Sequence, residues 1–151
     1  GRKVLEVMKE AGLVKGGGGL KVFVMCELPA NVILAEQFLE MFDGFSIGSN
    51  DLTQFTLGLD RDNSEMSGIA NEKNEAVKEL VKEAIRVCKK MNKYSGICGD
   101  APSTFLEFTK FLVDQGIDSI SLSSDAIIKT TMAVLEYEKE KNGDPNLQMT
   151  H

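Results

Sequence analysis

Histidine is almost absent from this chain: among 151 residues the only one is His151, at the last position. Catalysis within one chain by a serine–histidine–aspartate or a cysteine–histidine arrangement is therefore excluded. A phosphohistidine in the interior of the sequence and a histidine-rich metal site are excluded with it. The chemistry of this chain must therefore rest on carboxylates, amides or thiols.

Cysteine is also scarce, and Cys26, Cys88 and Cys98 form no CxxC pair. Three cysteines are too few for a disulfide scaffold, and their sparse placement favours a reducing, cytoplasmic setting. No stretch approaches the ~20 continuous apolar residues of a membrane span. The N-terminal residues 1–3 also lack the apolar segment of a signal peptide. We therefore expect no membrane association.

Positive charge is in deficit, with 17 basic against 23 acidic residues and a net charge of −6. A surface of this sign repels phosphate backbones and anionic lipid, so nucleic acid is disfavoured as a partner. Hydrophobic residues make up 42% of the chain and charged residues 26%, which is a globular balance. The length suits one ordinary domain.

What is present is an alternation of strand and helix patterns, repeated four times. Short apolar runs predict strands at 21–26, 45–48, 94–98 and 118–122. Helical spacing predicts helices at 3–11, 30–42, 72–91, 103–115 and 124–140, with a short helical turn over 52–58. We interpret Gly16–Gly19 as a flexible loop, 59–71 as a polar loop and 142–151 as a polar tail. The folded domain is thus expected to span residues 1–141.

Repeated strand–helix units predict an α/β fold with a parallel sheet. Both a Rossmann-like sheet and a (β/α)8 barrel fit this alternation. Polar side chains follow one strand after another, as on the catalytic face of a barrel, and this favours the barrel. Four units are only half a barrel, so its two open edges need four more strands, either from a missing part of the chain or from a second copy.

Two carboxylates at adjacent strand ends are candidate metal ligands. Glu27 follows a buried strand directly, where a carboxylate is costly to bury unless it is paired or metal-bound. Asp51 follows the next strand, beside Asn50. Mg²⁺ is commonly bound by one or two carboxylates, with water and substrate oxygens completing its shell. A salt bridge for Glu27 and a helix cap for Asp51 are the alternative interpretations.

The cysteines fall into two groups. Cys98 ends the third predicted strand between Gly96 and Gly99, where it is either a buried small hydrophobe or a general acid/base at the catalytic face. Cys88 lies on the charged helix 72–91, and we expect it to be structural.

Four segments resemble the phosphoenolpyruvate-utilising enzymes. Residues 44–62, GFSIGSNDLTQFTLGLDRD, look like the signature of that family, and residues 96–103, GICGDAPS, resemble its cysteine motif. Residues 116–122, GIDSISL, are similar to its last barrel strand, and residues 24–34, VMCELPANVIL, to the segment with its metal-binding glutamate. The Ala-Pro-Ser after the cysteine resembles the synthase branch of the family rather than pyruvate phosphate dikinase.

The resemblance implies the C-terminal half of a pyruvate- and phosphoenolpyruvate-binding TIM barrel. By analogy, Glu27 and Asp51 would bind Mg²⁺, Cys98 would be the general acid/base at the substrate methyl carbon, and the substrate would be lined by Glu27, Gly48, Ser49, Asn50 and Asp51. The implied reaction converts ATP, pyruvate and water to phosphoenolpyruvate, AMP and phosphate.

The phosphohistidine and nucleotide-binding domains that this reaction needs are absent from the sequence, as are the first four barrel strands. We therefore expect the chain to be a fragment that is inactive alone. The alternatives are a non-catalytic module for assembly as a homodimer or higher homo-oligomer, and a dikinase-like relative. Two features depart from the family pattern. Gly16–Gly19 replaces a more polar loop, and Asp100 stands where glutamine is usual, so that its charge would disfavour ionisation of the Cys98 thiol.

Overall fold

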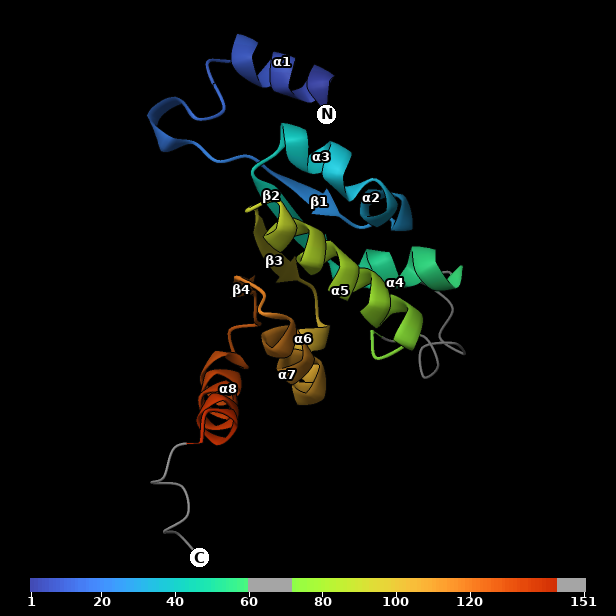
Figure 1. Ribbon diagram of the computed structural model, residues 1–151, viewed down its shortest axis with the longest axis vertical. Coiled ribbons are helices and arrows are strands. Elements are labelled where there is room, and N and C mark those ends of the chain that lie inside the picture. The colour runs from blue at the N-terminus through green and yellow to red at the C-terminus, as the bar shows by residue number, and fades with distance from the viewer. Residues whose placement is uncertain (60–71, 144–151) are drawn as a thin grey trace, which may run out of the picture.

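The structure is a computed structural model that describes residues 1–59 and 72–143. At its centre lies a sheet of four parallel strands in the order β1-β2-β3-β4. The strands are β1 (Phe23–Cys26), β2 (Gly44–Gly48), β3 (Tyr94–Cys98) and β4 (Ser119–Ile120). Their order in space follows their order in the chain without the reversal of a Rossmann-like sheet, as in a barrel (Figure 1). The predicted α/β architecture is confirmed, and it is consistent with part of a barrel.

Helices follow every strand, and one precedes the first. They are α1 (Arg2–Glu10), α2 (Pro29–Ile33), α3 (Ala35–Met41), α4 (Ser49–Leu57), α5 (Glu75–Lys90), α6 (Ala101–Thr104), α7 (Leu106–Gln115) and α8 (Ile127–Lys141). The glycine run contains a 3₁₀ turn, η1 (Gly17–Gly19). Gly116 ends α7 in the left-handed conformation with φ +66°, which favours glycine.

Several predicted boundaries were wrong. The single helix expected at 30–42 is two helices that meet at Leu34. The short turn expected at 52–58 is a nine-residue helix that begins at Ser49, immediately after β2. The last strand has two residues instead of five, and α8 begins at Ile127, three residues later than expected. Most of the predicted polar loop and of the tail lies outside the described residues.

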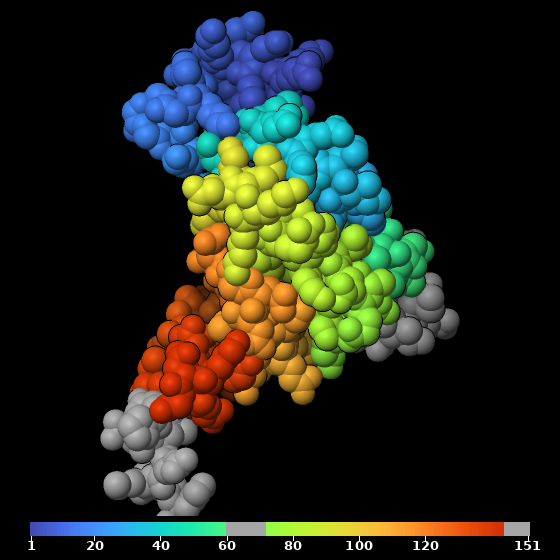
Figure 2. Space-filling view, viewed as in Figure 1, coloured from blue at the N-terminus to red at the C-terminus, as the bar shows by residue number. Residues whose placement is uncertain are grey.

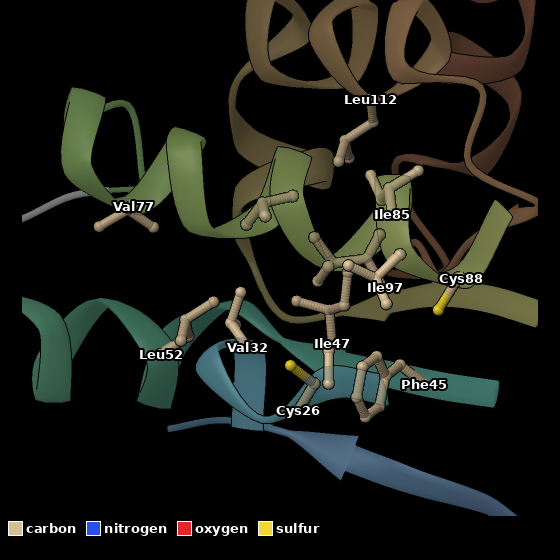
Figure 3. Close-up of a cluster of buried hydrophobic side chains, with 14 of the residues drawn as sticks. Cys26, Val32, Phe45, Ile47, Leu52, Val77, Ile85, Cys88, Ile97 and Leu112 are labelled. Atoms are coloured by element: carbon tan, nitrogen blue, oxygen red, sulfur yellow. The ribbon is translucent and has the colours of Figure 1, made fainter. Parts of the chain in front are cut away.

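One face of the sheet is packed against helices. Alternate strand residues point to this face, and Phe45, Ile47 and Ile97 are almost completely buried there. Figure 3 shows them beneath α5, which contributes Val77 and Ile85 to the same cluster. The core therefore lies between the sheet and α5.

The other face of the sheet is open within the described residues. The strand positions that alternate with the buried ones point to this face. They include Phe23, which is 43% exposed, Met25 at 41% and Tyr94 at 37%. The rings of Phe23 and Tyr94 lie 4.6 Å apart across Gly44, where a Cβ would overlap the Tyr94 carbonyl oxygen. In a closed barrel such positions point inward, so this open face corresponds to the interior of a barrel.

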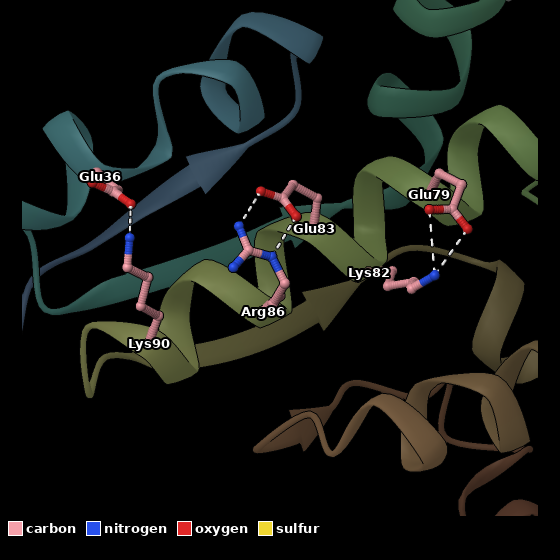
Figure 4. Close-up of polar contacts among 6 residues, drawn as sticks. All are labelled: Glu36, Glu79, Lys82, Glu83, Arg86 and Lys90. Atoms are coloured by element: carbon pink, nitrogen blue, oxygen red, sulfur yellow. Dashed lines mark hydrogen bonds and ion pairs between the residues drawn. The ribbon is translucent and has the colours of Figure 1, made fainter.

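The charged residues of α5 form a solvated helix face. Lys82 binds Glu79 at 3.1 Å and Arg86 binds Glu83 at 2.6 Å, each pair three residues apart on the helix (Figure 4). Lys90 reaches across to Glu36 on α3 at 2.6 Å. Each exposed pair adds little stability, because solvent screens the two charges. Their role is to keep the outer face of α5 in solvent.

The molecule is elongated, with α1 at one end and α8 at the other (Figure 2). None of the residues of α1 is buried, and only Thr130 is buried on α8. Among the helices of residues 1–59 and 72–143, none combines the length and apolar character needed to cross a membrane.

Candidate functional site

The carboxyl ends of β1, β2 and β3 meet at one edge of the sheet, because the strands are parallel. Gly48, the last residue of β2, is paired with Cys98, the last residue of β3. On the other side of Gly48, Glu27 directly follows β1. These three positions form one row across the open face, with the glycine in the middle. The missing side chain of Gly48 leaves room between a carboxylate and a thiol.

Glu27 extends its side chain over Gly48. A Cβ added at Gly48 would lie 2.6 Å from Glu27 Cγ and 2.7 Å from its Oε1. The backbone of Glu27 is fixed by Asn31 in the first turn of α2, whose Oδ1 accepts from the amides of Glu27 at 3.1 Å and Leu28 at 2.9 Å. The site thus depends on a glycine at position 48, which leaves space for the carboxylate.

Asp51 lies in the first turn of α4, three residues after Gly48. The helix begins without any loop after β2, because Ser49 is buried and its carbonyl accepts a hydrogen bond from Thr53 Oγ1 at 2.7 Å. A carboxylate in a first helical turn is favoured by the helix dipole. The buried positions Ser49, Leu52 and Thr53 have helical spacing, a signal that could have predicted this early start.

Glu27 and Asp51 both remain free to bind a cation. Within the described residues, no ion pair or side-chain hydrogen bond involves either carboxylate. The salt bridge considered for Glu27 is therefore not found there. Among the same residues, no cluster of three or more histidine, cysteine or acidic side chains could hold a metal on protein ligands alone. Two carboxylates that follow neighbouring strands are a donor set that would suit Mg²⁺, which takes its other ligands from water and substrate.

Asn50 is tied to the end of β3. Its Nδ2 donates to Asp100 Oδ2 at 2.8 Å, and its Oδ1 accepts from the backbone amide of Asp100 at 3.1 Å. Ser49 Oγ also donates to Asn50 Oδ1, at 3.3 Å. The Asp100 carboxylate therefore has a hydrogen-bond partner at the start of α4. Because Gly48 pairs with Cys98 in the sheet, the residues that follow these two strand ends, Asn50 and Asp100, lie close together.

Cys98 is half-buried, and its Sγ lies 3.6 Å from Ser46 Oγ. Ser46 lies two residues before Gly48 on the same face of β2. A hydroxyl this close can donate a hydrogen bond to the sulfur. Sequence reasoning missed Ser46, whose position in the strand gave no sign that it faces the thiol.

The other two cysteines are buried in the core, as predicted for Cys88. Burial raises the pKa of the Cys26 thiol to about 12, and the nearby Cys88 and Glu27 add to this. Burial also raises the pKa of Cys88 to about 11. At about pH 8 the thiolate fractions are then on the order of 10⁻⁴ for Cys26 and 10⁻³ for Cys88.

We therefore expect iodoacetamide at about pH 8 to modify Cys98 and to leave Cys26 and Cys88 intact, since the thiolate is the nucleophile. Because both pKa values are raised, the two thiols ionise only as the pH approaches those values. Peptide mass mapping of the labelled chain measures the outcome, and labelling in denaturant, where all three cysteines react, is the control. Equal labelling of the three cysteines in the folded chain would contradict the assignment.

Comparison with known proteins finds related sequences over almost the whole chain. The model of the family described as "PEP-utilising enzyme, PEP-binding domain" matches residues 2–139. Phosphoenolpyruvate synthase of Aquifex aeolicus is 57% identical over 140 residues, which is 93% of this chain and 16% of the relative. The proteins of the same name from Helicobacter pylori and Escherichia coli are 56% and 51% identical, again over more than nine-tenths of this chain and 17% of their own length. The chain thus spans about a sixth of the length of these curated relatives.

Proposed function

Because the chain belongs to the PEP-utilising enzymes and corresponds to their PEP-binding domain, we propose that it supplies the pyruvate- and PEP-binding site of a phosphoenolpyruvate synthase. The proposed reaction of the whole enzyme converts ATP, pyruvate and water to PEP, AMP and phosphate. The observation that carries the proposal is the row of Glu27, Gly48 and Cys98 at one sheet edge, with Asn50 and Asp51 beside it. Residues 1–141 form the proposed barrel portion.

Glu27 and Asp51 are the proposed Mg²⁺ ligands. When bound, Mg²⁺ supplies positive charge that stabilises negative oxygen atoms of the substrate. Gly48 and Ser49 line the substrate in this proposal, and Gly48 leaves the space that the Glu27 carboxylate takes up beside it. The side-chain amide of Asn50 donates a hydrogen bond to a substrate oxygen. Together these groups hold pyruvate with its methyl carbon toward Cys98.

Cys98 is the proposed general acid/base. Its thiolate removes a proton from the methyl carbon of pyruvate, and the C–H electron pair becomes the double bond of the enolate. The enolate oxygen then attacks the phosphorus of a phosphohistidine, so that a P–O bond forms as the P–N bond breaks. That phosphohistidine and the nucleotide site belong to other domains, so the chain alone is proposed to be inactive. The three free cysteines support a cytoplasmic location.

A role in assembly alone is the second candidate, and the open sheet face favours it. Phe23 and Met25 on that face are exposed, and the outer edges of β1 and β4 have no strand partner in the described part of the chain. Four further barrel strands or a second copy of the chain would cover these surfaces, giving a homodimer or higher homo-oligomer. A dikinase-like relative would use the same binding site.

The test is calorimetric titration of the chain with oxalate, a planar analogue of the pyruvate enolate, with and without Mg²⁺. We expect binding that requires Mg²⁺ and is lost on chelation, since the two carboxylates would otherwise repel the dianion. Acetate at the same concentration is the control, because it lacks the second carboxylate. A folded chain that binds no oxalate with Mg²⁺ would overturn the proposed site and leave only the assembly role.

A further inference from the structure

The amide group of Asn50 has only one orientation compatible with its neighbours. The backbone N–H of Asp100 can only donate, so it must face Asn50 Oδ1, at 3.1 Å. The Asp100 carboxylate can only accept when ionised, so it must face Asn50 Nδ2, at 2.8 Å. The flipped amide would place a donor against the N–H and an acceptor against the carboxylate. Asp100 thus dictates the orientation of Asn50.

Asp100 reaches Asn50 because of the residue that precedes it. Gly99 has φ +135° and turns the end of β3 against the first turn of α4. A Cβ at Gly99 would overlap Ser49 Oγ and lie 2.6 Å from Asn50 Oδ1. The bond from the Asp100 backbone amide to Asn50 is therefore set by backbone geometry at two paired strand ends, and the exposed Asp100 carboxylate adds the second bond.

One hydrogen of the Asn50 amide remains available. Nδ2 carries two hydrogens, and Asp100 accepts one of them. No other residue in the described ranges accepts from Nδ2. Because Oδ1 already accepts from the Asp100 amide and from Ser49 Oγ, the amide can offer a ligand only a donor. The arrangement suits a ligand oxygen atom with negative charge.

We propose that Asp100 is a positioning residue, which holds the Asn50 amide so that its free N–H donates to a substrate oxygen. This inference rests on the proposed function for its substrate, and it assigns Asp100 a role through Asn50 rather than on Cys98. A purely structural link between β3 and α4 is the alternative, and it would give Asp100 no influence on ligand binding beyond its effect on folding.

The first test needs no ligand. In an amide NMR spectrum of the folded chain, the two Nδ2 hydrogens of Asn50 should give well-separated resonances, one of them slow to exchange with solvent. Asp100→Ala should speed that exchange and move the resonance toward the position of a free asparagine amide, and Asp100→Asn should keep most of the protection, because the asparagine oxygen can still accept. The backbone carbonyl of residue 100, which accepts from Ser103 and Thr104 amides, is retained in both variants. An unchanged Asn50 signal in Asp100→Ala would overturn the inference.

The second test is a double-mutant cycle on Mg²⁺-dependent oxalate binding. Asp100→Ala should weaken binding about 10-fold, which is the effect of losing one oriented hydrogen bond, and Asp100→Asn should stay within about 3-fold of the original chain. In a chain that already carries Asn50→Ala, Asp100→Ala should have no further effect. Glu107→Ala on α7 removes an equal, exposed charge and serves as the matched control.

Equal losses from Asp100→Ala with and without Asn50 would overturn the inference, because Asp100 would then act independently of Asn50. Absence of oxalate binding to the unaltered chain is a different result: it overturns the proposed function and the substrate role of the Asn50 N–H with it. The amide spectrum alone then decides whether Asp100 holds Asn50.

Discussion

Glu27→Gln and Asp51→Asn are each expected to weaken Mg²⁺-dependent oxalate binding by at least about 100-fold. Removal of a group that only hydrogen-bonds to a metal ligand lowers metal affinity about 10- to 100-fold, and removal of the ligand itself lowers it further. Each substitution keeps the shape of the side chain and removes its charge. Calorimetric titration with Mg²⁺ present measures the effect.

Glu27→Gln should leave stability almost unchanged, and Asp51→Asn should lower it only slightly, because a carboxylate in the first turn of α4 is favoured by the helix dipole. Neither carboxylate has an ion-pair or hydrogen-bond partner within the described residues, so neutralising it breaks no contact there. Glu36→Gln is the matched control, since it loses a surface ion pair with Lys90 and should not affect binding. Full oxalate affinity in both Glu27→Gln and Asp51→Asn would contradict the metal assignment.

The carboxylate of Glu27 can also be displaced without being neutralised. Gly48 has φ −89° and ψ 92°, a conformation open to alanine, but the added Cβ would lie 2.6 Å from Glu27 Cγ. Gly48→Ala must therefore push the side chain of Glu27 away from the strand end. Gly48→Ala should weaken Mg²⁺-dependent oxalate binding, as Glu27→Gln does, because the carboxylate keeps its charge but loses its position at the strand end.

The sequence was sufficient to predict the parts of this site that depend on one segment at a time. Glu27 and Asp51 each follow an apolar strand, and parallel strands bring their carboxyl ends to one edge. Residue types alone left two interpretations open for each carboxylate, a metal ligand or a structural role, and the family resemblance favoured the metal ligand. The architecture and the membership of the family were predicted correctly for the same reason: both follow from local patterns and motifs.

The contacts between segments could not be predicted from local patterns. Asn50 and Asp100 are 50 residues apart, and Ser46 and Cys98 are 52 apart. Their contact depends on the register between β2 and β3, and a shift by one residue would turn each side chain to the other face. The break between α2 and α3 was missed because helical spacing continues across Leu34 while the backbone there leaves the helix. Tertiary packing determines these contacts and the point at which α2 ends.

Gly99→Ala is expected to destabilise the folded chain by about 3 kcal/mol, through strain at positive φ and overlap with neighbouring atoms. The backbone at Gly99 has φ +135°, which side chains rarely adopt. The added Cβ would also overlap Ser49 Oγ, and Ser49 is fully buried at the start of α4. For a chain of this size the loss corresponds to a fall of roughly 10 °C in the thermal midpoint. Thermal unfolding followed by circular dichroism measures it.

Gly12→Ala distinguishes backbone strain at positive φ from overlap with neighbouring atoms as the cause of the lost stability. Gly12 also has positive φ, at +85°, but a Cβ there would have no atom within 4 Å. It should cost about 1 kcal/mol from backbone strain alone. Equal losses at positions 12 and 99 would show that the close approach to α4 does not require glycine. A larger loss of stability at position 99, together with weaker oxalate binding, would mean that Gly99 both joins β3 to α4 and brings Asp100 to Asn50. Stability and substrate recognition would then depend on the same backbone turn.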